Sequence, residues 1–302
     1  MDKIVPPLKI WIYVASTVVL GFSIIFLYCY LKYPSRNVMS QAYIEGLRYA
    51  IGADKRLNSR KVTIIICGSS LSSVAFPNIT LIEKKISDET KKVNILRISI
   101  SGLNMEKAEN SKSFDDIAES PPDYLFLEVN NLLINDMDKK SFSMLFALNR
   151  LMGDILYEIH KTLGTKPNND FEKMDPLIAQ SFLSGRFDSV IFKKALAKKH
   201  EVRKFSDNKV MNDAFIRLRE KKTKIIFLNF PRSSKLESVF LDDNRKREFG
   251  YLLTIYKKLY NIDCWTYPHF LHDSQFIDGG HLNYKGSEIY LNWFCDKFNS
   301  VK

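Results

Sequence analysis

The chain has 302 residues, of which 45% are hydrophobic and 26% charged, and it contains 12 Gly and 10 Pro. These proportions are typical of globular proteins, and they exclude a disordered chain, a collagen-like repeat and a membrane protein with many spans. Lys and Arg number 45 against 34 Asp and Glu, so the formal net charge is +11. Because basic and acidic residues are mixed along the chain, this charge indicates general attraction to anionic polymers or lipid headgroups, and no nucleic-acid module is expected.

The four cysteines are Cys29, Cys67, Cys264 and Cys295, and no two of them have C-x-x-C spacing. A zinc ribbon or a thioredoxin-type redox motif is therefore not predicted. Cys29 falls in an apolar run, which leaves three widely spaced cysteines, and an odd number argues against a disulfide framework. The sequence predicts buried single thiols.

An uncharged run of 22 residues, Ile10 to Leu31, is bracketed by Lys9 and Lys32. As a helix it would be ~33 Å long, enough for a hydrocarbon core of ~30 Å. The sequence after it offers no small-x-small cleavage site, so a retained membrane anchor is favoured over a signal peptide. The basic residues on its two sides are balanced, so charge does not predict its orientation.

The next segment, 38–53, predicts a short helix that leads from the membrane into a folded unit. Five apolar runs of strand length follow. They are 62–67, 95–100, 124–129, 224–230 and 264–267. Most of these runs are continuously apolar, as is typical of parallel strands covered on both faces.

Apolar residues at helical spacing predict four further helices. They cover 141–163, 207–221, 244–260 and 283–298. The polar stretches 104–122 and 164–177 predict surface loops. Because strands and helices alternate and a helix closes the chain, the sequence predicts a doubly wound α/β sheet.

In an open parallel sheet, ligands bind beyond the carboxyl ends of the strands, so the residues that follow each strand are of interest. The first predicted strand is followed by Gly68-Ser69-Ser70-Leu71. A glycine there allows a sharp turn, and Ser70 can begin a helix with its hydroxyl exposed. On these four residues alone, a plain helix N-cap is the favoured interpretation, because serine is common at caps.

Two other strand ends carry candidate hydrogen-bond donors. Gly102 follows the second strand, where its N–H could point at an oxyanion or simply form a turn. Asn130 and Asn131 follow the third strand. Their side-chain amides suit a developing negative charge, although an Asn pair is also common in turns.

Near the C-terminus, Asp278-Gly-Gly-His281 precedes the last predicted helix. An Asp three residues before a His can accept a hydrogen bond from imidazole Nδ1, which leaves Nε2 free to take a proton from a serine. His269 and His272 have H-x-x-H spacing, but Pro268 and the lack of a helical pattern weaken a zinc site. No metal is expected.

Two further residues lie at strand ends. Arg232, after the fourth strand, could bind an anionic group at the same end of the sheet or be a solvated loop residue. Cys67, at the end of the first strand, is predicted to belong to the core rather than to act as a nucleophile.

From about residue 60 to its end, the chain resembles the SGNH (GDSL-like) hydrolase superfamily. The Gly-x-Ser-Leu motif of that superfamily matches 68–71, with Ser69 where many members have Asp. Gly102 matches the glycine of the second motif. The third motif is usually Gly-x-Asn-Asp, whereas EVNN stands at 128–131, which leaves Asn130 and Asn131 as alternatives for the amide donor. The D-x-x-H and LNxxG motifs match 278–281 and 282–286.

The resemblance implies a three-layer α/β/α, flavodoxin-like fold with a parallel five-stranded sheet, and chemistry that needs no cofactor. It implies Ser70 as the nucleophile, His281 as general base and then acid, and Asp278 as the residue that orients His281. The oxyanion hole would comprise the N–H groups of Ser70 and Gly102 and the amide of Asn130 or Asn131.

The Gly-Ser-Ser variant and the single anchor resemble the superfamily branches of teichoic-acid D-alanyl transfer and alginate O-acetylation. This implies an esterase or acyltransferase acting on O-acyl groups of an envelope polysaccharide, a membrane-bound O-acyltransferase as partner, and a domain outside the cytoplasm. The alternative is a catalytically inactive SGNH-fold scaffold or polysaccharide-binding protein. The expected organisation is a tail (1–9), a transmembrane helix (10–31), a linker with a leading helix (32–60) and the hydrolase-like domain (61–302).

Overall fold

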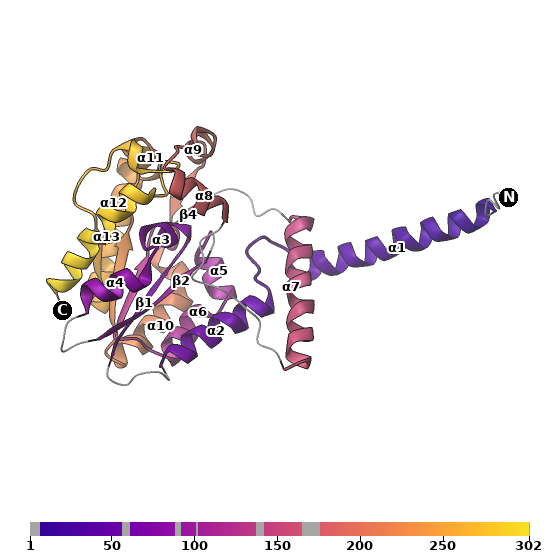
Figure 1. Cartoon of the computed structure of the whole chain (residues 1–302), viewed down its shortest axis with the longest axis horizontal. Helices are drawn as coiled ribbons and strands as arrows, with labels where there is room; N and C mark the ends of the chain where they lie inside the picture. The colour runs from indigo at the N-terminus through magenta and orange to yellow at the C-terminus, as the bar shows by residue number, and fades with distance from the viewer. Residues whose placement is uncertain are drawn as a thin grey trace. The chain divides into compact units, whose positions relative to one another are not determined.

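The computed structural model describes residues 7–55, 61–87, 92–100, 102–136, 142–164 and 176–301. The chain divides into two compact units. The first comprises 1–43 and 139–167, and the second comprises 44–138 and 168–302. Figure 1 labels the helices of both units and the strands β1, β2 and β4.

Five strands form the parallel sheet of the second unit, in the order β2-β1-β3-β6-β7. They are β1 (Val62–Gly68), β2 (Val93–Ser99), β3 (Tyr124–Glu128), β6 (Lys224–Asn229) and β7 (Asp263–Thr266). Their side chains are mostly buried because helices cover both faces of the sheet, which is why these runs are continuously apolar. The predicted flavodoxin-like, five-stranded sheet is confirmed.

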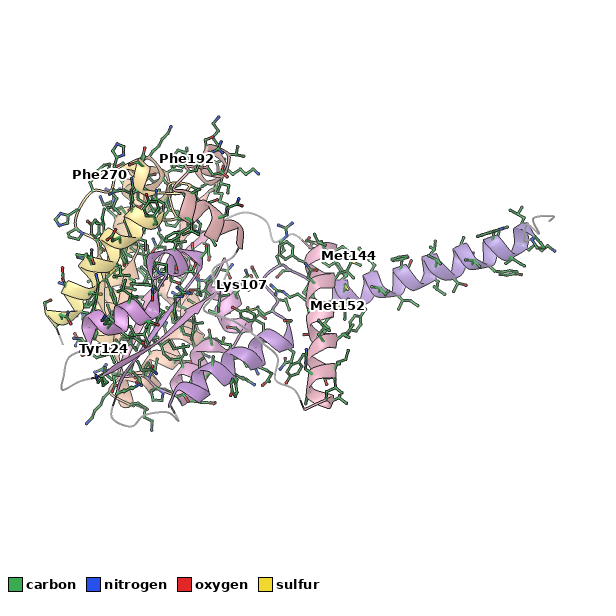
Figure 2. All side chains as sticks on the ribbon, in the orientation of Figure 1. Lys107, Tyr124, Met144, Met152, Phe192 and Phe270 are labelled. Atoms are coloured by element: carbon green, nitrogen blue, oxygen red, sulfur yellow. The ribbon has the colours of Figure 1, made fainter. Side chains whose placement is uncertain are left out.

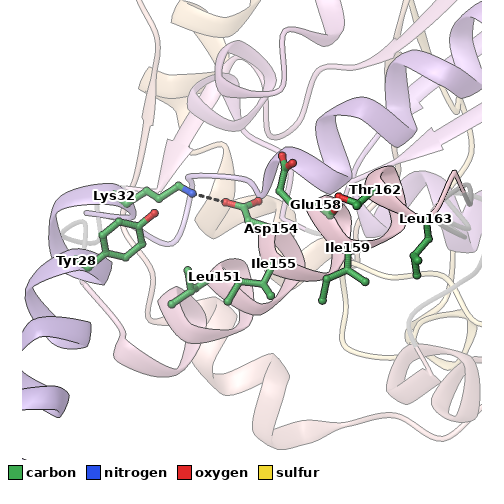
Figure 3. Close-up of a pocket in the computed structure, with 9 residues that line it drawn as sticks. All are labelled: Tyr28, Lys32, Leu151, Asp154, Ile155, Glu158, Ile159, Thr162 and Leu163. Atoms are coloured by element: carbon green, nitrogen blue, oxygen red, sulfur yellow. Dashed lines mark hydrogen bonds and ion pairs between the residues drawn. The ribbon is translucent and has the colours of Figure 1, made fainter.

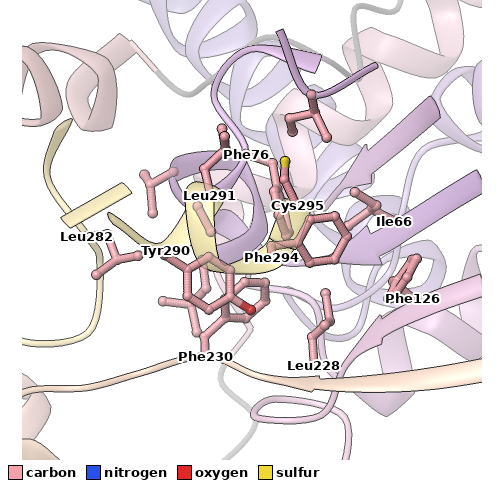
Figure 4. Packing of buried hydrophobic residues seen from close by; sticks show 14 of the residues in the cluster. Ile66, Phe76, Phe126, Leu228, Phe230, Leu282, Tyr290, Leu291, Phe294 and Cys295 are labelled. Atoms are coloured by element: carbon pink, nitrogen blue, oxygen red, sulfur yellow. The ribbon is translucent and has the colours of Figure 1, made fainter. Parts of the chain in front are cut away.

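One face of the sheet is covered by α3 (Ser70–Ala75), α4 (Ile79–Ile86) and α13 (Tyr284–Asn299). Aromatic rings fill this layer, and Phe294 of α13 packs edge-on against Phe126 of β3 with ring centroids 5.1 Å apart (Figure 4).

The opposite face is covered by α6 (Ser113–Glu119), α10 (Lys209–Glu220) and α12 (Asp243–Tyr260). There Phe227 of β6 packs against Tyr256 of α12 with ring centroids 5.1 Å apart. The two aromatic layers fix the three-layer arrangement.

The other elements are short or connecting. They are α2 (Gln41–Lys55), α5 (Met105–Asn110), β4 (Ile134–Asp136), α8 (Pro176–Ser184), α9 (Ser189–Leu196), β5 (His200–Val202), η1 (Phe205–Asn208), α11 (Ser234–Phe240) and η2 (Asp273–Gln275). β4 and β5 form an antiparallel pair that the sequence did not predict, because three residues are too few to show a period.

The prediction of a loop over 104–122 was wrong, because α5 and α6 occupy most of it. Tertiary contacts stabilise these polar helices. Asn104 caps α5 by accepting a hydrogen bond from the Lys107 amide at 2.9 Å, and Asp116 of α6 pairs with Arg48 at 3.1 Å. Most of the other predicted loop, 165–175, lies outside the described residues.

The first unit contains α1 (Leu8–Lys32) and α7 (Met144–Thr162). Along α1, Cys29 is the buried residue, and side chains project from the helix on all sides (Figure 2). Among the described residues, α1 is the helix long and apolar enough to cross a membrane, as a membrane anchor or a signal sequence would be. The helix predicted over 141–163 is confirmed as α7.

Candidate active site

The site lies where the strand order changes direction. Along the chain, β2 is added on one side of β1 and β3 on the other, which creates a switch point at the carboxyl ends of β1 and β3. β1 ends at Gly68, and Ser69 then caps α3 by accepting the Leu71 amide at 3.2 Å. Ser70 is the first residue of α3 and is partly exposed at this switch point.

The structure brings Ser70, His281 and Asp278 into one hydrogen-bonded chain. Ser70 Oγ lies 2.7 Å from His281 Nε2, and His281 Nδ1 lies 2.8 Å from Asp278 Oδ2. With Nδ1 donating to the carboxylate, Nε2 is the acceptor for the Ser70 hydroxyl proton. Asp278 and His281 are 3 positions apart and share one turn, whereas Ser70 is 211 positions from His281, so the fold brings these two together.

The turn that carries Asp278 holds its carboxylate firmly. Asp278 Oδ1 also accepts hydrogen bonds from the amides of Gly280 at 3.1 Å and His281 at 2.8 Å. Burial alone would raise the pKa of Asp278, but the hydrogen bonds and the nearby imidazole outweigh it and lower the pKa below its ordinary value. Asp278 is therefore an ionised acceptor for His281.

Gly279 sets the shape of this turn. Its φ of +80° lies in the left-handed region that favours glycine. A Cβ at this position would lie 2.6 Å from the Phe192 ring and 2.8 Å from Ser233 Oγ. The Ser233 amide donates to the Gly279 carbonyl at 2.7 Å, which ties the turn to the segment after β6.

The LNxxG motif positions the helix after the site. Leu282 is buried in the core, and Asn283 caps α13 by accepting the amides of Lys285 and Gly286 at 3.1 and 3.2 Å. The Asn283 side chain also donates to the Ser274 carbonyl at 2.7 Å, so it joins the α13 N-terminus to η2.

A buried carboxylate contacts Ser69, the residue before Ser70, and its role was not predicted from the sequence. Glu128, at the end of β3, accepts the Ser69 amide at 2.6 Å and the Ser69 hydroxyl at 2.8 Å. Burial raises the pKa of Glu128, and the hydrogen bonds from Ser69 oppose that shift. A charged residue ending an otherwise buried strand was the available sequence signal.

The two candidate amides are both bonded to protein groups. Asn130 is fully buried, and its amide donates to Asn229 Oδ1 at 3.2 Å and to the Phe230 carbonyl at 3.3 Å. Asn131 is partly exposed, and its amide donates to Ser69 Oγ at 3.0 Å and Glu128 Oε1 at 2.8 Å. Asn130 therefore joins the ends of β3 and β6, whereas Asn131 lies beside the turn that carries Ser70.

The backbone donors are placed differently. In the first turn of α3, the amides of Leu71, Ser72 and Ser73 are bonded to Ser69, but within the described part of the chain the Ser70 amide has no acceptor. Gly102 is exposed after β2, the neighbour of β1, and has a left-handed φ of +58°.

Arg232 is not a solvated loop residue, because its side chain is only 4% exposed. Its Nη1 pairs with Glu237 at 2.8 Å, and its guanidinium lies 3.7 Å from the Phe240 ring centroid. Within the described residues, its Nη2 has no hydrogen-bond partner.

Cys67 and His272 have structural roles. Cys67 is buried, which raises its pKa to about 12 and confirms the prediction that it belongs to the core. His272 Nδ1 accepts the Ser274 amide at 3.2 Å and so caps η2. In the described ranges, His, Cys, Asp and Glu form no group suited to a metal ion.

No protein-family model matches the chain, and no curated protein matches it. Three solved structures are similar to it. A candidate acylhydrolase from Bacteroides fragilis has 10% identity and a TM-score of 0.40, over 86% of this chain and 98% of that one. A GDSL-like lipase from Bacteroides thetaiotaomicron has 9% identity and a TM-score of 0.43, over 86% and 99%. A candidate platelet activating factor protein from Streptococcus pneumonia has 12% identity and a TM-score of 0.38, over 85% and 92%.

Proposed function

We propose that this protein is an SGNH-type serine esterase or acyltransferase that uses Ser70, His281 and Asp278. The observation that carries the proposal is the chain of hydrogen bonds from Ser70 Oγ through His281 to Asp278, with Ser70 and His281 reachable from solvent. A nucleophile bonded to a base, which is in turn oriented by a third group, is the arrangement that activates serine.

In the first half-reaction, His281 Nε2 takes the proton of Ser70 while Oγ bonds to the carbonyl carbon of an ester. The resulting oxyanion lies near the N–H groups of Ser70 and Gly102, which we propose as its donors. When the carbon–oxygen bond to the leaving alcohol breaks, protonated His281 gives its proton to that alcohol. The product is an acyl-Ser70.

In the second half-reaction, His281 takes a proton from water or from a sugar hydroxyl, whose oxygen attacks the acyl carbon. When this intermediate collapses, the bond between the acyl carbon and Ser70 Oγ breaks, Oγ takes the proton back from His281, and the free acid or the acylated sugar is released. The ionised Asp278 stabilises the imidazolium in both halves and keeps Nδ1 protonated.

Neither side-chain amide needs to act as a donor in this scheme. Both amides of Asn130 and Asn131 are already bonded to protein groups, so donation to the oxyanion would require one of these bonds to break. We therefore assign them a positioning role, with Asn131 supporting the Ser69–Glu128 contact.

We further propose transfer to an envelope polysaccharide rather than hydrolysis alone, with a membrane-bound O-acyltransferase as the source of acyl groups. The support is the apolar helix α1, because a tether raises the effective concentration of donor and acceptor at the membrane. The net charge of +11 suits an anionic acceptor. On this proposal the second unit lies outside the cytoplasm.

A fluorophosphonate probe tests the nucleophile directly, because it reacts with activated serines. We expect the wild-type protein to be labelled and Ser70→Ala to lose labelling completely. Ser72→Ala is the matched control: Ser72 lies in the same turn but is fully buried, so labelling should persist. If the folded wild-type protein is not labelled, the alternative of a non-catalytic scaffold replaces this proposal.

Mass spectrometry of envelope glycans incubated with enzyme and an acyl donor tests transfer, with Ser70→Ala as the control. We expect glycans to gain acyl groups. Glycans that only lose acyl groups would make the protein an esterase.

A further inference from the structure

Helix α7 carries an apolar stripe that the protein leaves exposed. The stripe repeats at spacings of three and four residues, so its members lie on one side of the helix. They are Leu145, Leu148, Met152, Ile155, Leu156, Ile159 and Leu163. Their exposed fractions run from 39% for Leu148 to 70% for Leu163. Among the described residues of the first unit, no side chain covers this stripe, and an exposed apolar patch of this kind on a helix of 19 residues is typical of a surface that contacts a partner or a membrane.

The position of α7 relative to α1 is fixed by one carboxylate. Asp154 of α7 pairs with Lys32 at 2.9 Å and accepts hydrogen bonds from the Tyr33 hydroxyl and, at 2.6 Å, from the Gln41 amide. Beside it, Cys29 and Ala147 are buried together with Tyr33. These contacts hold the middle of α7 against the last turn of α1.

As a result, α7 crosses the end of α1 instead of running alongside it (Figure 1). A cavity of about 520 Å³ opens in the angle between the two helices. The Lys32–Asp154 pair lies at its inner corner, and Leu151, Ile155 and Ile159 point from α7 toward the side on which α1 extends (Figure 3).

We propose that α7 lies flat in the lipid–water interface of the leaflet that contains the C-terminal end of α1. Its apolar stripe is then buried among lipid acyl chains, and the cavity beneath it is filled by such a chain. Where α1 spans the bilayer, a helix fixed across its end lies in the plane of the membrane surface. The cavity's apolar side faces the bilayer interior, and its charged residues, the Lys32–Asp154 pair and Glu158, lie at headgroup depth.

One cation–π contact fits this depth. The Arg36 guanidinium lies 5.0 Å from the Phe146 ring centroid. Aromatic rings with adjacent cations are typical of the interface, where one end of the pair is apolar and the other is hydrated. The occupant proposed for the stripe is therefore lipid and not a second protein helix.

The test uses the full chain in phosphatidylcholine vesicles with an environment-sensitive fluorophore on single introduced cysteines, in a Cys264→Ser background. The other three native cysteines are buried. Met152→Cys and Leu156→Cys report on the stripe. Lys161→Cys is the matched control on the opposite side of α7, and Val18→Cys reports on α1.

We expect doxyl-labelled lipids to remove most of the emission at 152 and 156, as at 18, and to leave that at 161 largely intact. If the probes at 152 and 156 keep their emission, the proposal is wrong, whether or not α1 is in the bilayer. If the probes at 152 and 156 are protected from the doxyl-labelled lipids only at a high protein-to-lipid ratio, a second copy of the chain covers the stripe, and the proposal is also overturned. Because Ser70 labelling is not the readout, failure of the proposed enzyme function would not change this result.

Discussion

The carboxylate of Glu128 receives both the amide and the hydroxyl of Ser69, at 2.6 and 2.8 Å, directly beneath the turn that exposes Ser70. Ser69, directly before Ser70, has no acidic side chain of its own, and the neighbouring strand β3 supplies a carboxylate. The close approach also explains Gly68, because a Cβ there would lie 2.6 Å from Glu128 Oε2.

Glu128→Gln tests whether this carboxylate holds the turn. All three of its contacts come from donors, namely the Ser69 amide, the Ser69 hydroxyl and the Asn131 amide. An NH2 group in either orientation faces a donor, so we expect a loss of about 1–3 kcal/mol in the free energy of unfolding and weaker labelling of Ser70. Chemical denaturation gives the stability. Exposed Glu288→Gln is the control and should be near neutral; equal effects at the two positions would contradict the role of Glu128.

Gly279→Ala tests the turn between Asp278 and His281. The added Cβ meets the Phe192 ring and Ser233 at a positive φ, so we expect a destabilisation on the order of 1–3 kcal/mol and a loss of turnover. Gly250→Ala, in the open interior of α12, is the matched control and should stabilise by about 0.5–1 kcal/mol. Thermal unfolding shows whether each variant is less or more stable than the wild type. A stable, active Gly279→Ala protein would show that the turn accommodates a Cβ at this position.

Asp278→Asn should reduce ester turnover by on the order of 10³–10⁴-fold, because His281 would lose the acceptor that fixes its tautomer. His281→Ala should cost at least as much, and the double variant little more, since the residues act as a unit. Steady-state hydrolysis of p-nitrophenyl acetate measures all three. A loss of only a few-fold would count against the proposed triad.

The lowered pKa of Asp278 gives a pH dependence of stability with a definite sign. The Asp278 carboxylate binds a proton less tightly in the native state than in the unfolded chain. The ionised carboxylate therefore stabilises the fold at pH values above its ordinary pKa of 3.8. The stabilisation is lost as the pH falls through the lowered native pKa. The stability difference between wild type and Asp278→Asn should therefore be largest near neutral pH and shrink below pH 3.8, as urea unfolding would show. A difference that grows in acid would contradict this.

Asn130→Ala and Asn131→Ala should have different effects. Removing Asn130 leaves the buried Phe230 amide and carbonyl without their partner, which should cost about 1–3 kcal/mol per group. Removing partly exposed Asn131 should cost less stability, because Ser69 and Glu128 keep their mutual contacts. Denaturation together with fluorophosphonate labelling separates the cases. If either variant folds normally but loses labelling selectively, that amide is an oxyanion donor after all.

Membrane retention tests α1 by itself. The full chain should stay with the membrane pellet after a carbonate wash. Val18→Lys together with Phe22→Lys should weaken retention, since each charge near a helix centre costs about 2.5–3.5 kcal/mol. Release of the unmodified protein would argue against an anchor.

The five strands were predictable because helices bury them on both faces, which leaves a continuous apolar signal in runs such as 62–67. The helices over 105–110 and 113–119 were not, because their sequences are polar and the second depends on Arg48, 68 positions from its partner Asp116. Such distant partners cannot be inferred from the neighbouring residues in the sequence.

The same distinction holds at the site. Ser70, Asp278 and His281 could be nominated because strand ends and short motifs are local features. The distance between Ser70 and His281 could not be predicted, because the two residues are 211 positions apart in sequence. Glu128 was missed as a participant because its partner, Ser69, is 59 positions away.

The ion pair at Asp154 also orders events during synthesis. Tyr33 precedes its partner carboxylate by 121 residues. At about 5–20 residues per second, translation delivers Asp154 roughly 6–24 s after Tyr33. Throughout that interval the last turn of α1 has no docking partner from α7, so the first unit cannot close until most of the β1–β4 segment of the second has left the ribosome. A ribosome stalled between the two segments would therefore display α1 without the helix that crosses its end.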